Sequence, residues 1–519
     1  MFENDIVHNI IVAFCRFSFP VNTPINILIM SENLCIAAQN GHLRAVETLL
    51  ANRSDPNALG SDGLFPLYCA SQHNQSSIIQ ILLKHKAEVN LRTKSGFTSL
   101  QTAAEKGCED AVKILLEHGA DVNLASTSGS ISPLYFACMR GKNEVVKILL
   151  RHKAKVDACT YNGCTPLHTA AEHGYEDILN MLLENGADVN YGSNDGQNAL
   201  HYASMKADTK MIDLLLSKGL SVNATSENGC TPLYLAARNG NDDIALHLIK
   251  NGADINAPTV DGCTPFHTAA ENGHEAILNI LLENGADVNL RSKSGQNTLH
   301  YASGTADTKM IELLLSKGLS VNAASENGCT PLYLAARNGN DDVVLHLIKT
   351  GADINALTVE GCTPLHTAAE HMHEDILNIL LENGADVNLR SKSGQNTLHY
   401  ASRTADIKMI DLLLSKGLSV NAASEKGCTS LYLAARNGND DAVLHLIRNG
   451  ADINAPTVDG CTPLQAASEK GCTKTVEILL ENHANINKRQ NTGRTALYFA
   501  CKEGHVDVIK LLQQRGAMN

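Results

Sequence analysis

The sequence predicts an all-α solenoid of stacked helix-turn-helix units joined by short β-turn fingers. Three observations lead to this class: an apolar residue that returns every 33 residues, two short helical patterns inside each interval, and a composition without tryptophan. The chain has 519 residues and is 44% hydrophobic but only 4% aromatic, so its core must consist of many small aliphatic contacts. Stacked repeats provide such contacts, because each repeat buries its apolar faces against its two neighbours.

Fifteen units can be aligned on the apolar residue that begins the first helix of each. The spacing is 33 residues throughout, apart from one residue inserted near residues 128–130. Residues 31–519 therefore form the predicted array. The aligned residues are Leu34, Leu67, Leu100, Leu134, Leu167, Leu200, Leu233, Phe266, Leu299, Leu332, Leu365, Leu398, Leu431, Leu464 and Leu497.

One unit illustrates why each interval should fold as two helices. Thr165 is suited to cap the first helix, and Pro166 is suited to its first position. Residues 167–171 place apolar side chains at helical spacing, with small alanines that allow close helix approach. A second helix is predicted over residues 178–183, ending before Gly186, which can adopt the left-handed conformation of a helix cap.

The same unit carries a family resemblance. Its Thr-Pro-Leu-His at residues 165–168, Ala-Ala at 170–171, Leu-Leu at 182–183 and Gly-Ala-Asp-Val-Asn at 186–190 closely resemble the ankyrin repeat. The resemblance covers residues 31–519 and implies the ankyrin-repeat solenoid fold. Met372 departs from the pattern at the turn glycine, where a left-handed backbone would cost about 1 kcal/mol. Asn replaces the capping Thr at Asn198, Asn297 and Asn396, and it is an equally good cap.

The array has a larger period and distinct ends. Residues 164–460 are one three-repeat block copied three times, which indicates tandem duplication. Residues 1–30 are interpreted as a degenerate partial repeat or an irregular segment. Their acidic start does not suit a secretion signal. Gln513 occupies a position that is Leu or Ile in the other repeats, so we expect the last unit to be a polar cap that closes the array.

The ladders of histidine and cysteine are interpreted as structural, and no catalytic, metal or cofactor site is predicted. Each histidine is expected to bond across to a neighbouring turn. The cysteines contain no CxxC spacing and are expected to be free, solvent-facing thiols. A metal site at His371 and His373, with Glu370 and Glu374, is the weaker alternative to a variable turn. The ladders comprise His168, His201, His267, His300, His366 and His399, and Cys164, Cys230, Cys263, Cys329, Cys362, Cys428 and Cys461.

The resemblance implies protein partners bound along the concave face by the finger tips and the exposed side of the first helices. The formal net charge of −13 disfavours nucleic acid, and no stretch approaches the length of a membrane span. We expect a monomer in the cytoplasm, with the nucleus as the alternative. The predicted binding residues are Glu227, Asn228, Arg238, Asn239, Val260, Asp261, Glu271, Asn272, Glu326, Asn327, Arg337, Asn338, Val359, Glu360, Glu370 and His371.

Asn190, Asn289 and Asn388 lie in a pattern that resembles the one used by asparaginyl hydroxylases of ankyrin repeats; the alternative is that each simply caps its turn. For the whole chain, the leading hypothesis is a scaffold or adaptor without catalysis. A delivered effector or latrotoxin-like ankyrin protein is the main alternative, although the large N-terminal region of those toxins is not found here. A ubiquitin-ligase adaptor and a mechanical spring remain open.

Overall fold

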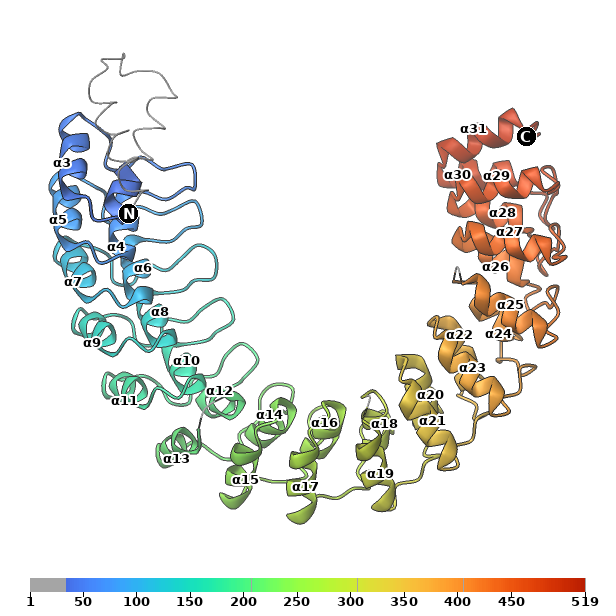
Figure 1. Cartoon of the computed structure of the whole chain (residues 1–519), viewed down its shortest axis with the longest axis horizontal. Helices are drawn as coiled ribbons and strands as arrows, with labels where there is room; N and C mark the ends of the chain where they lie inside the picture. Colours follow the sequence, from blue (N-terminus) through green and yellow to red (C-terminus); the bar gives the residue numbers. More distant parts are fainter. Residues whose placement is uncertain (1–33, 207, 306, 405, 519) are drawn as a thin grey trace, which may run out of the picture. The chain divides into compact units, whose positions relative to one another are not determined.

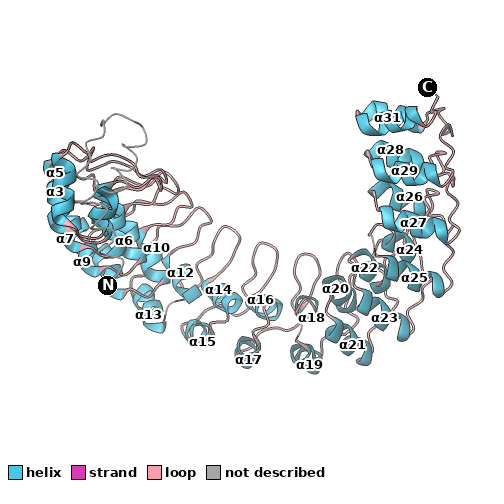
Figure 2. Ribbon diagram, turned by 45° about the horizontal axis from the view of Figure 1, so that its top comes forward, coloured by secondary structure: helices cyan, strands magenta, loops and turns pink. Residues whose placement is uncertain are grey.

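The structure is a computed structural model that describes residues 34–206, 208–305, 307–404 and 406–518. The predicted partial repeat at residues 1–30 lies outside these ranges. Helices occur in antiparallel pairs, and within each of the two compact units described below successive pairs lie side by side (Figure 1). The loops between pairs project away from the helices as fingers (Figure 2). The predicted all-α solenoid of helix-turn-helix units is therefore confirmed.

The first helix of each pair is short and lies next to the fingers. Residues 34–39 are also helical. The first helices are α4 (Pro66–Gln72), α6 (Ser99–Lys106), α8 (Pro133–Met139), α10 (Pro166–Glu172), α12 (Ala199–Lys206), α14 (Pro232–Asn239), α16 (Pro265–Glu271), α18 (Thr298–Ala302), α20 (Pro331–Asn338), α22 (Pro364–Glu370), α24 (Thr397–Ala401), α26 (Ser430–Asn437), α28 (Pro463–Lys470) and α30 (Ala496–Glu503).

The second helix of each pair is nine residues long. The second helices are α3 (Leu43–Ala51), α5 (Ser76–Lys84), α7 (Glu109–Glu117), α9 (Asn143–Arg151), α11 (Glu176–Glu184), α13 (Thr209–Ser217), α15 (Asp242–Lys250), α17 (Glu275–Glu283), α19 (Thr308–Ser316), α21 (Asp341–Lys349), α23 (Glu374–Glu382), α25 (Ile407–Ser415), α27 (Asp440–Arg448), α29 (Thr473–Glu481) and α31 (Val506–Gln514).

Local sequence sets the helix boundaries as expected. Thr165 and His168 form a reciprocal capping box at the start of α10, and Pro166 occupies its first turn. Asn297 and Asn396 cap α18 and α24 through their side chains, so the substitution of Thr by Asn preserves the cap. Met372 has a φ of 61°, so the residue at the position of the turn glycine has a left-handed backbone and the strain considered above applies to it.

The core consists of the small aliphatic contacts that the composition requires. Leu167, Ala170 and Ala171 of α10 are buried, as are Ile178 and Leu182 of α11. The alanines bring neighbouring first helices close together, and the leucines of the second helices fill the space behind them. Each described repeat is therefore stabilised mainly by the repeats on either side of it.

The chain divides into two compact units, Met1–Ala236 with Asp243–Asp254, and Ala237–Asp242 with Ile255–Asn519. We refer to them as unit 1 and unit 2. Each is a stack of helix pairs with its own core. None of the helices in the described ranges is long and apolar enough to span a lipid bilayer.

Candidate protein-interaction surface

In unit 2 the predicted binding residues occupy two rows, whereas in unit 1 they comprise only the finger-tip residues Glu227 and Asn228. One row follows the finger tips, and the other follows the carboxyl ends of the first helices. All sixteen predicted side chains are exposed except Glu370, which is half-buried. The structure therefore places these residues on the surface, as predicted, but it adds several residues to both rows.

The finger tips are joined by a ladder of backbone hydrogen bonds. In unit 2 the Val359 N–H donates to the Asn327 carbonyl at 2.8 Å, and the Lys392 N–H donates to the Glu360 carbonyl at 2.8 Å. The Lys293 N–H donates to the Asp261 carbonyl in the same way. Lys293 and Lys392 were not among the predicted residues. The 33-residue register could have identified both, because Lys293 lies between the predicted tips Val260 and Glu326, and Lys392 follows the predicted tip Val359.

The helix-end row contains ion pairs between neighbouring repeats. Glu370 contacts Arg403 of the next repeat at 3.0 Å in unit 2. In unit 1, Arg140 approaches Glu105 at 2.8 Å and Lys206 approaches Glu172 at 2.6 Å. Of the residues in these three pairs, only Glu370 was predicted from the sequence. The sequence pattern that could have indicated these ion pairs is a basic residue 33 to 35 positions after an acidic one.

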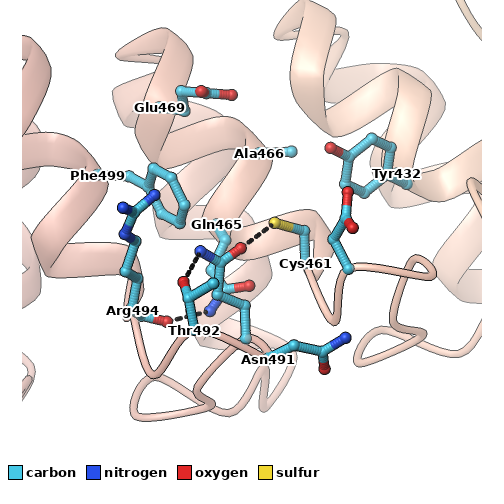
Figure 3. Close-up of a pocket in the computed structure, with 11 residues that line it drawn as sticks. Tyr432, Cys461, Gln465, Ala466, Glu469, Asn491, Thr492, Arg494 and Phe499 are labelled. Atoms are coloured by element: carbon cyan, nitrogen blue, oxygen red, sulfur yellow. Dashed lines mark hydrogen bonds between the residues drawn. The ribbon is translucent and has the colours of Figure 1, made fainter.

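A hollow of about 300 Å³ lies in unit 2, in the angle between the fingers and helices α26, α28 and α30. Tyr432 and Phe499 lie on opposite sides of Gln465 in this hollow (Figure 3). Burial raises the pKa of Tyr432 to about 12, so its hydroxyl stays protonated at neutral pH. The full lining is Tyr432, Asp459, Cys461, Gln465, Ala466, Glu469, Gln490, Asn491, Thr492, Arg494 and Phe499.

The charges of this hollow favour the binding of a basic side chain. The carboxylates of Asp459 and Glu469 form no ion pair with another described residue. Arg494 is the one cation in the lining, and its guanidinium lies 5.1 Å from the ring centroid of Tyr498. Two unpaired carboxylates beside aromatic faces suit a lysine or arginine side chain, because cations are attracted to both groups.

Unit 1 contains a smaller hollow of about 210 Å³ at the same repeat positions. Tyr68, Gln101 and Phe136 line it and correspond in the repeat register to Tyr432, Gln465 and Phe499. Its Glu105 is paired with Arg140, so it lacks the free carboxylates of the hollow in unit 2. Both volumes are at or below the lower limit of small-molecule sites, roughly 300–1,000 Å³, and suit a single side chain.

Two further hollows lie among the second helices of unit 1. One is lined by residues of α13 and α15, including Asp243 and His247, and has a volume of about 460 Å³. The other is lined by Asn143 and residues 174–177. Neither is lined by several aromatic side chains, and neither recurs at equivalent positions among the hollows described in unit 2.

The histidine ladder is structural, as predicted, and five of its six rings bond across to a neighbouring turn through Nε2; Nε2 of His366 is buried without a hydrogen-bond partner among the described residues. In the repeat that contains α22, the Thr363 N–H donates to Nδ1 of His366, so Nε2 carries the proton of the neutral ring. In the equivalent repeat, Nε2 of His267 lies 3.1 Å from the Leu290 carbonyl. Burial lowers the pKa of both histidines to about 4. Gln465 makes the corresponding bonds in α28, which shows that the position needs an acceptor and a donor rather than an imidazole.

The cysteine ladder differs from its prediction in exposure. The described cysteines are free, as expected, but those of the ladder are half-buried rather than solvent-facing. Cys362 Sγ lies 3.2 Å from the hydroxyl of Tyr400, and Cys263 has the same contact with Tyr301 at 3.1 Å. Burial raises the pKa of the Cys263 thiol, so this sulfur is a poor nucleophile at neutral pH.

The cluster at residues 370–374 is occupied by structural contacts. Nδ1 of His371 lies 3.0 Å from the Thr367 carbonyl, and Nε2 of His373 lies 3.0 Å from the Arg337 carbonyl. In the part of the chain that the structure describes, no group of three histidine, cysteine, aspartate or glutamate side chains could hold a metal ion.

A second ladder joins the turns that follow the second helices. In most repeats, the side chain of an asparagine accepts a hydrogen bond from the backbone N–H 31 residues later; we call this contact the Asn rung. Asn322 accepts from the Asp353 N–H at 2.7 Å and also donates to the Gly351 carbonyl at 3.1 Å. Asn355 accepts from the Asp386 N–H at 2.9 Å. The rungs tie each turn to the next.

The rung is missing at three described positions, which are the proposed hydroxylation residues Asn190, Asn289 and Asn388. All three side chains are exposed and form no hydrogen bond with another described residue. In each case the following repeat has a buried leucine at the position in the facing turn where the other repeats have alanine or, at Ser54, serine. These leucines are Leu220, Leu319 and Leu418. Their turn-closing backbone hydrogen bonds are long, at 3.3 to 3.4 Å, which indicates that the larger side chain displaces the turn.

Comparison with known proteins agrees with the repeat geometry. A family model described as "Ankyrin repeats (3 copies)" matches residues 34–126, 125–193, 190–259, 255–325, 299–391, 388–457 and 431–519. Together these matches cover nearly the whole chain. No curated protein matches the chain in the corresponding search.

Proposed function

Because the chain belongs to the ankyrin-repeat family, which is a family of protein-interaction modules, we propose that it is a scaffold or adaptor for protein partners. In this proposal, partners bind along the face formed by the fingers and the first helices. They are anchored in the hollow of unit 2 by a lysine or arginine side chain. We assign the chain no catalytic role, and we place it in a reducing compartment, the cytoplasm or the nucleus, in keeping with its free cysteines.

The observation that carries the proposal is the recurrence of an aromatic hollow at the same repeat positions in both units. Protein interfaces draw most of their binding energy from a few side chains that fill well-packed pockets. Such a pocket needs a rigid frame. The Gln465 amide supplies one, since it donates to the Lys488 carbonyl at 2.8 Å and to the Arg494 carbonyl at 3.1 Å, joining helix α28 to the finger.

The charge of the hollow in unit 2 is the reason for proposing a basic side chain as its anchor. The net charge of −13 favours basic partner surfaces in general, and Asp459 and Glu469 focus this preference on one hollow. A basic side chain seated there would replace water around two carboxylates with a cation between aromatic walls. The hollow in unit 1 would instead accept an apolar side chain, because its Glu105 is already neutralised by Arg140.

Proximity labelling in cells tests the proposal, with the full chain as bait. The variant Asp459→Lys/Glu469→Lys reverses the charge of the hollow. A matched control, Glu283→Lys/Glu382→Lys, makes the same change in net charge at exposed positions on the second helices. We expect the hollow variant to lose a set of labelled proteins that the control retains. Equal labelling by the two variants and the unaltered chain would refute the hollow as an anchor.

A further inference from the structure

The finger tips of unit 2 carry a repeating order of side chains that the concave-face interpretation does not use. Reading along the row, an apolar tip is followed by a basic tip and then an acidic tip, and the order repeats every three repeats. All seven side chains are exposed. The row is Val260, Lys293, Glu326, Val359, Lys392, Glu425 and Val458.

The row is rigid. Each tip from Lys293 onward donates its backbone N–H to a carbonyl in the preceding finger, at distances between 2.8 and 3.0 Å. Within a finger the turn is closed as well: the Thr358 N–H donates to the Cys362 carbonyl at 2.9 Å, and the Cys362 N–H donates to Thr358 Oγ1 at 3.0 Å. A surface that is already ordered loses little conformational entropy when it binds.

The side chains of the central tips form no ion pair with another described residue, and the apolar ones are exposed. Val359 is 47% exposed, and Leu357 in the same finger is 54% exposed. The charges of Lys392 and Glu326, on either side of Val359, pair with no other described residue. An apolar contact between two opposite unpaired charges is therefore presented to solvent at this point of the row.

This arrangement is complementary to itself. When the row is reversed about Val359, the valine faces a valine, each lysine faces a glutamate and each glutamate faces a lysine. A two-fold axis imposes that reversal, because it places the same surface of two copies face to face in opposite directions. Lys392 would then face Glu326 of the second copy, and Glu326 would face Lys392 of the second copy.

We propose that a second copy of this chain is the partner of the finger-tip row, and that the two copies associate about a two-fold axis at Val359. Leu357 and Val359 of both copies form the apolar centre, and two pairs of Lys392 with Glu326 flank it. Three fingers from each copy make a small contact, so the dimer is weak, and its charged flanks make it sensitive to salt. Glu360 opposes itself near the axis and reduces the affinity.

The proposal replaces the expectation of a monomer. It is independent of the hollow of unit 2, because Tyr432, Asp459 and Glu469 take no part in it. Loss of partner labelling in the hollow variant and loss of self-association are therefore separate results.

Sedimentation equilibrium of the full chain at low salt, over a range of concentrations, provides the test. Two single variants reverse one charge each: Glu326→Lys and Lys392→Glu. Each puts like charges opposite one another twice, so we expect the dissociation constant to rise about tenfold or more. A control with Lys349→Glu and Glu382→Lys, at exposed positions on α21 and α23, should dimerise like the unaltered chain. Circular dichroism should confirm that every variant is folded.

Mixing gives the decisive result. The two single variants should form a heterodimer, because the lysine introduced at position 326 of one chain would face the glutamate introduced at position 392 of the other. In the doubly substituted chain, Glu326→Lys with Lys392→Glu, the self-pairing should return. Glu360→Gln should tighten the dimer by removing the like-charge contact. The proposal is overturned if the unaltered chain stays monomeric, if the mixture does not associate, or if Glu360→Gln leaves the affinity unchanged.

Discussion

Removal of one Asn rung should weaken a single turn of the stack without unfolding the repeat. Asn322→Ala eliminates the bond from the Asp353 N–H and the bond to the Gly351 carbonyl. Asn289→Ala is the matched comparison, because Asn289 occupies the same place in its repeat but makes no such bond. The two substitutions remove the same atoms from the same kind of turn, so their difference isolates the rung.

The structure sets the size of the effect. A hydrogen bond contributes about 0.5–1.5 kcal/mol net, and Asn322 is exposed, so its two bonds should together contribute about 1–2 kcal/mol. A free-energy change of that size corresponds to a factor of about 5–30 in the population of the open turn. Asn289→Ala should stay within about 0.5 kcal/mol of the unaltered chain, as surface substitutions away from such contacts do.

Native-state hydrogen exchange provides the local measurement, because long repeat arrays do not unfold in a single cooperative step. The Asp353 amide should exchange about 5–30 times faster in Asn322→Ala. The Val359 amide, which belongs to the finger-tip ladder, should be unaffected and serves as the internal control. If the Ser320 amide, opposite Asn289, changes as much in Asn289→Ala as the Asp353 amide does in Asn322→Ala, the rung is not the source of the effect.

Three further predictions concern the backbone strain at Met372, the protonation of His366 and the burial of the cysteines. Met372→Gly should stabilise unit 2 by about 0.5–1 kcal/mol, since glycine relieves the left-handed strain and Met372 is 58% exposed; a lower midpoint in urea would contradict this. His366 has a folded pKa of about 4, below its ordinary value of 6.5, so its contribution is complete above pH 6.5 and is lost as the pH falls towards 4. His366→Gln, which copies the natural Gln465, should preserve stability at neutral pH and shift acid unfolding, followed by circular dichroism, to lower pH. Among the described cysteines, Cys501, which is exposed, should be alkylated first and the fully buried Cys138 last, as peptide mass spectrometry would show; the reverse order would contradict the burial argument.

Much of the fold could be predicted because the pattern of apolar and capping residues returns in every repeat with a period of 33 residues, apart from one inserted residue. Thr165, Pro166 and Gly186 mark the helix ends by local chemistry, and the structure places each as expected. The left-handed backbone of Met372 was predictable for the same reason, since the register identified the glycine that it replaces. These features depend on neighbours close in sequence.

The site was less predictable because it depends on contacts between repeats. The hollow of unit 2 requires Tyr432, Gln465 and Phe499 from three successive repeats, and no single repeat contains the pattern. The half-buried sulfur of Cys362 could not be foreseen from its place in a turn, because Tyr400 of the next repeat covers it. A comparison of each position with the positions one and two periods away would have identified both.

The neighbouring repeats that lack the Asn rung are joined by other contacts instead. The interface that follows Asn388 also contains the Cys362–Tyr400 hydrogen bond and the contact of His366 with the Tyr400 ring, at a centroid distance of 5.0 Å. That contact lies near the finger base, whereas the absent rung would join the turns behind the second helices. Such an interface is held by contacts near the finger base and lacks the hydrogen bond that would join the turns at its opposite edge. Thermal bending of unit 2 should therefore concentrate at these interfaces, which recur every 99 residues, and should open them towards the second helices.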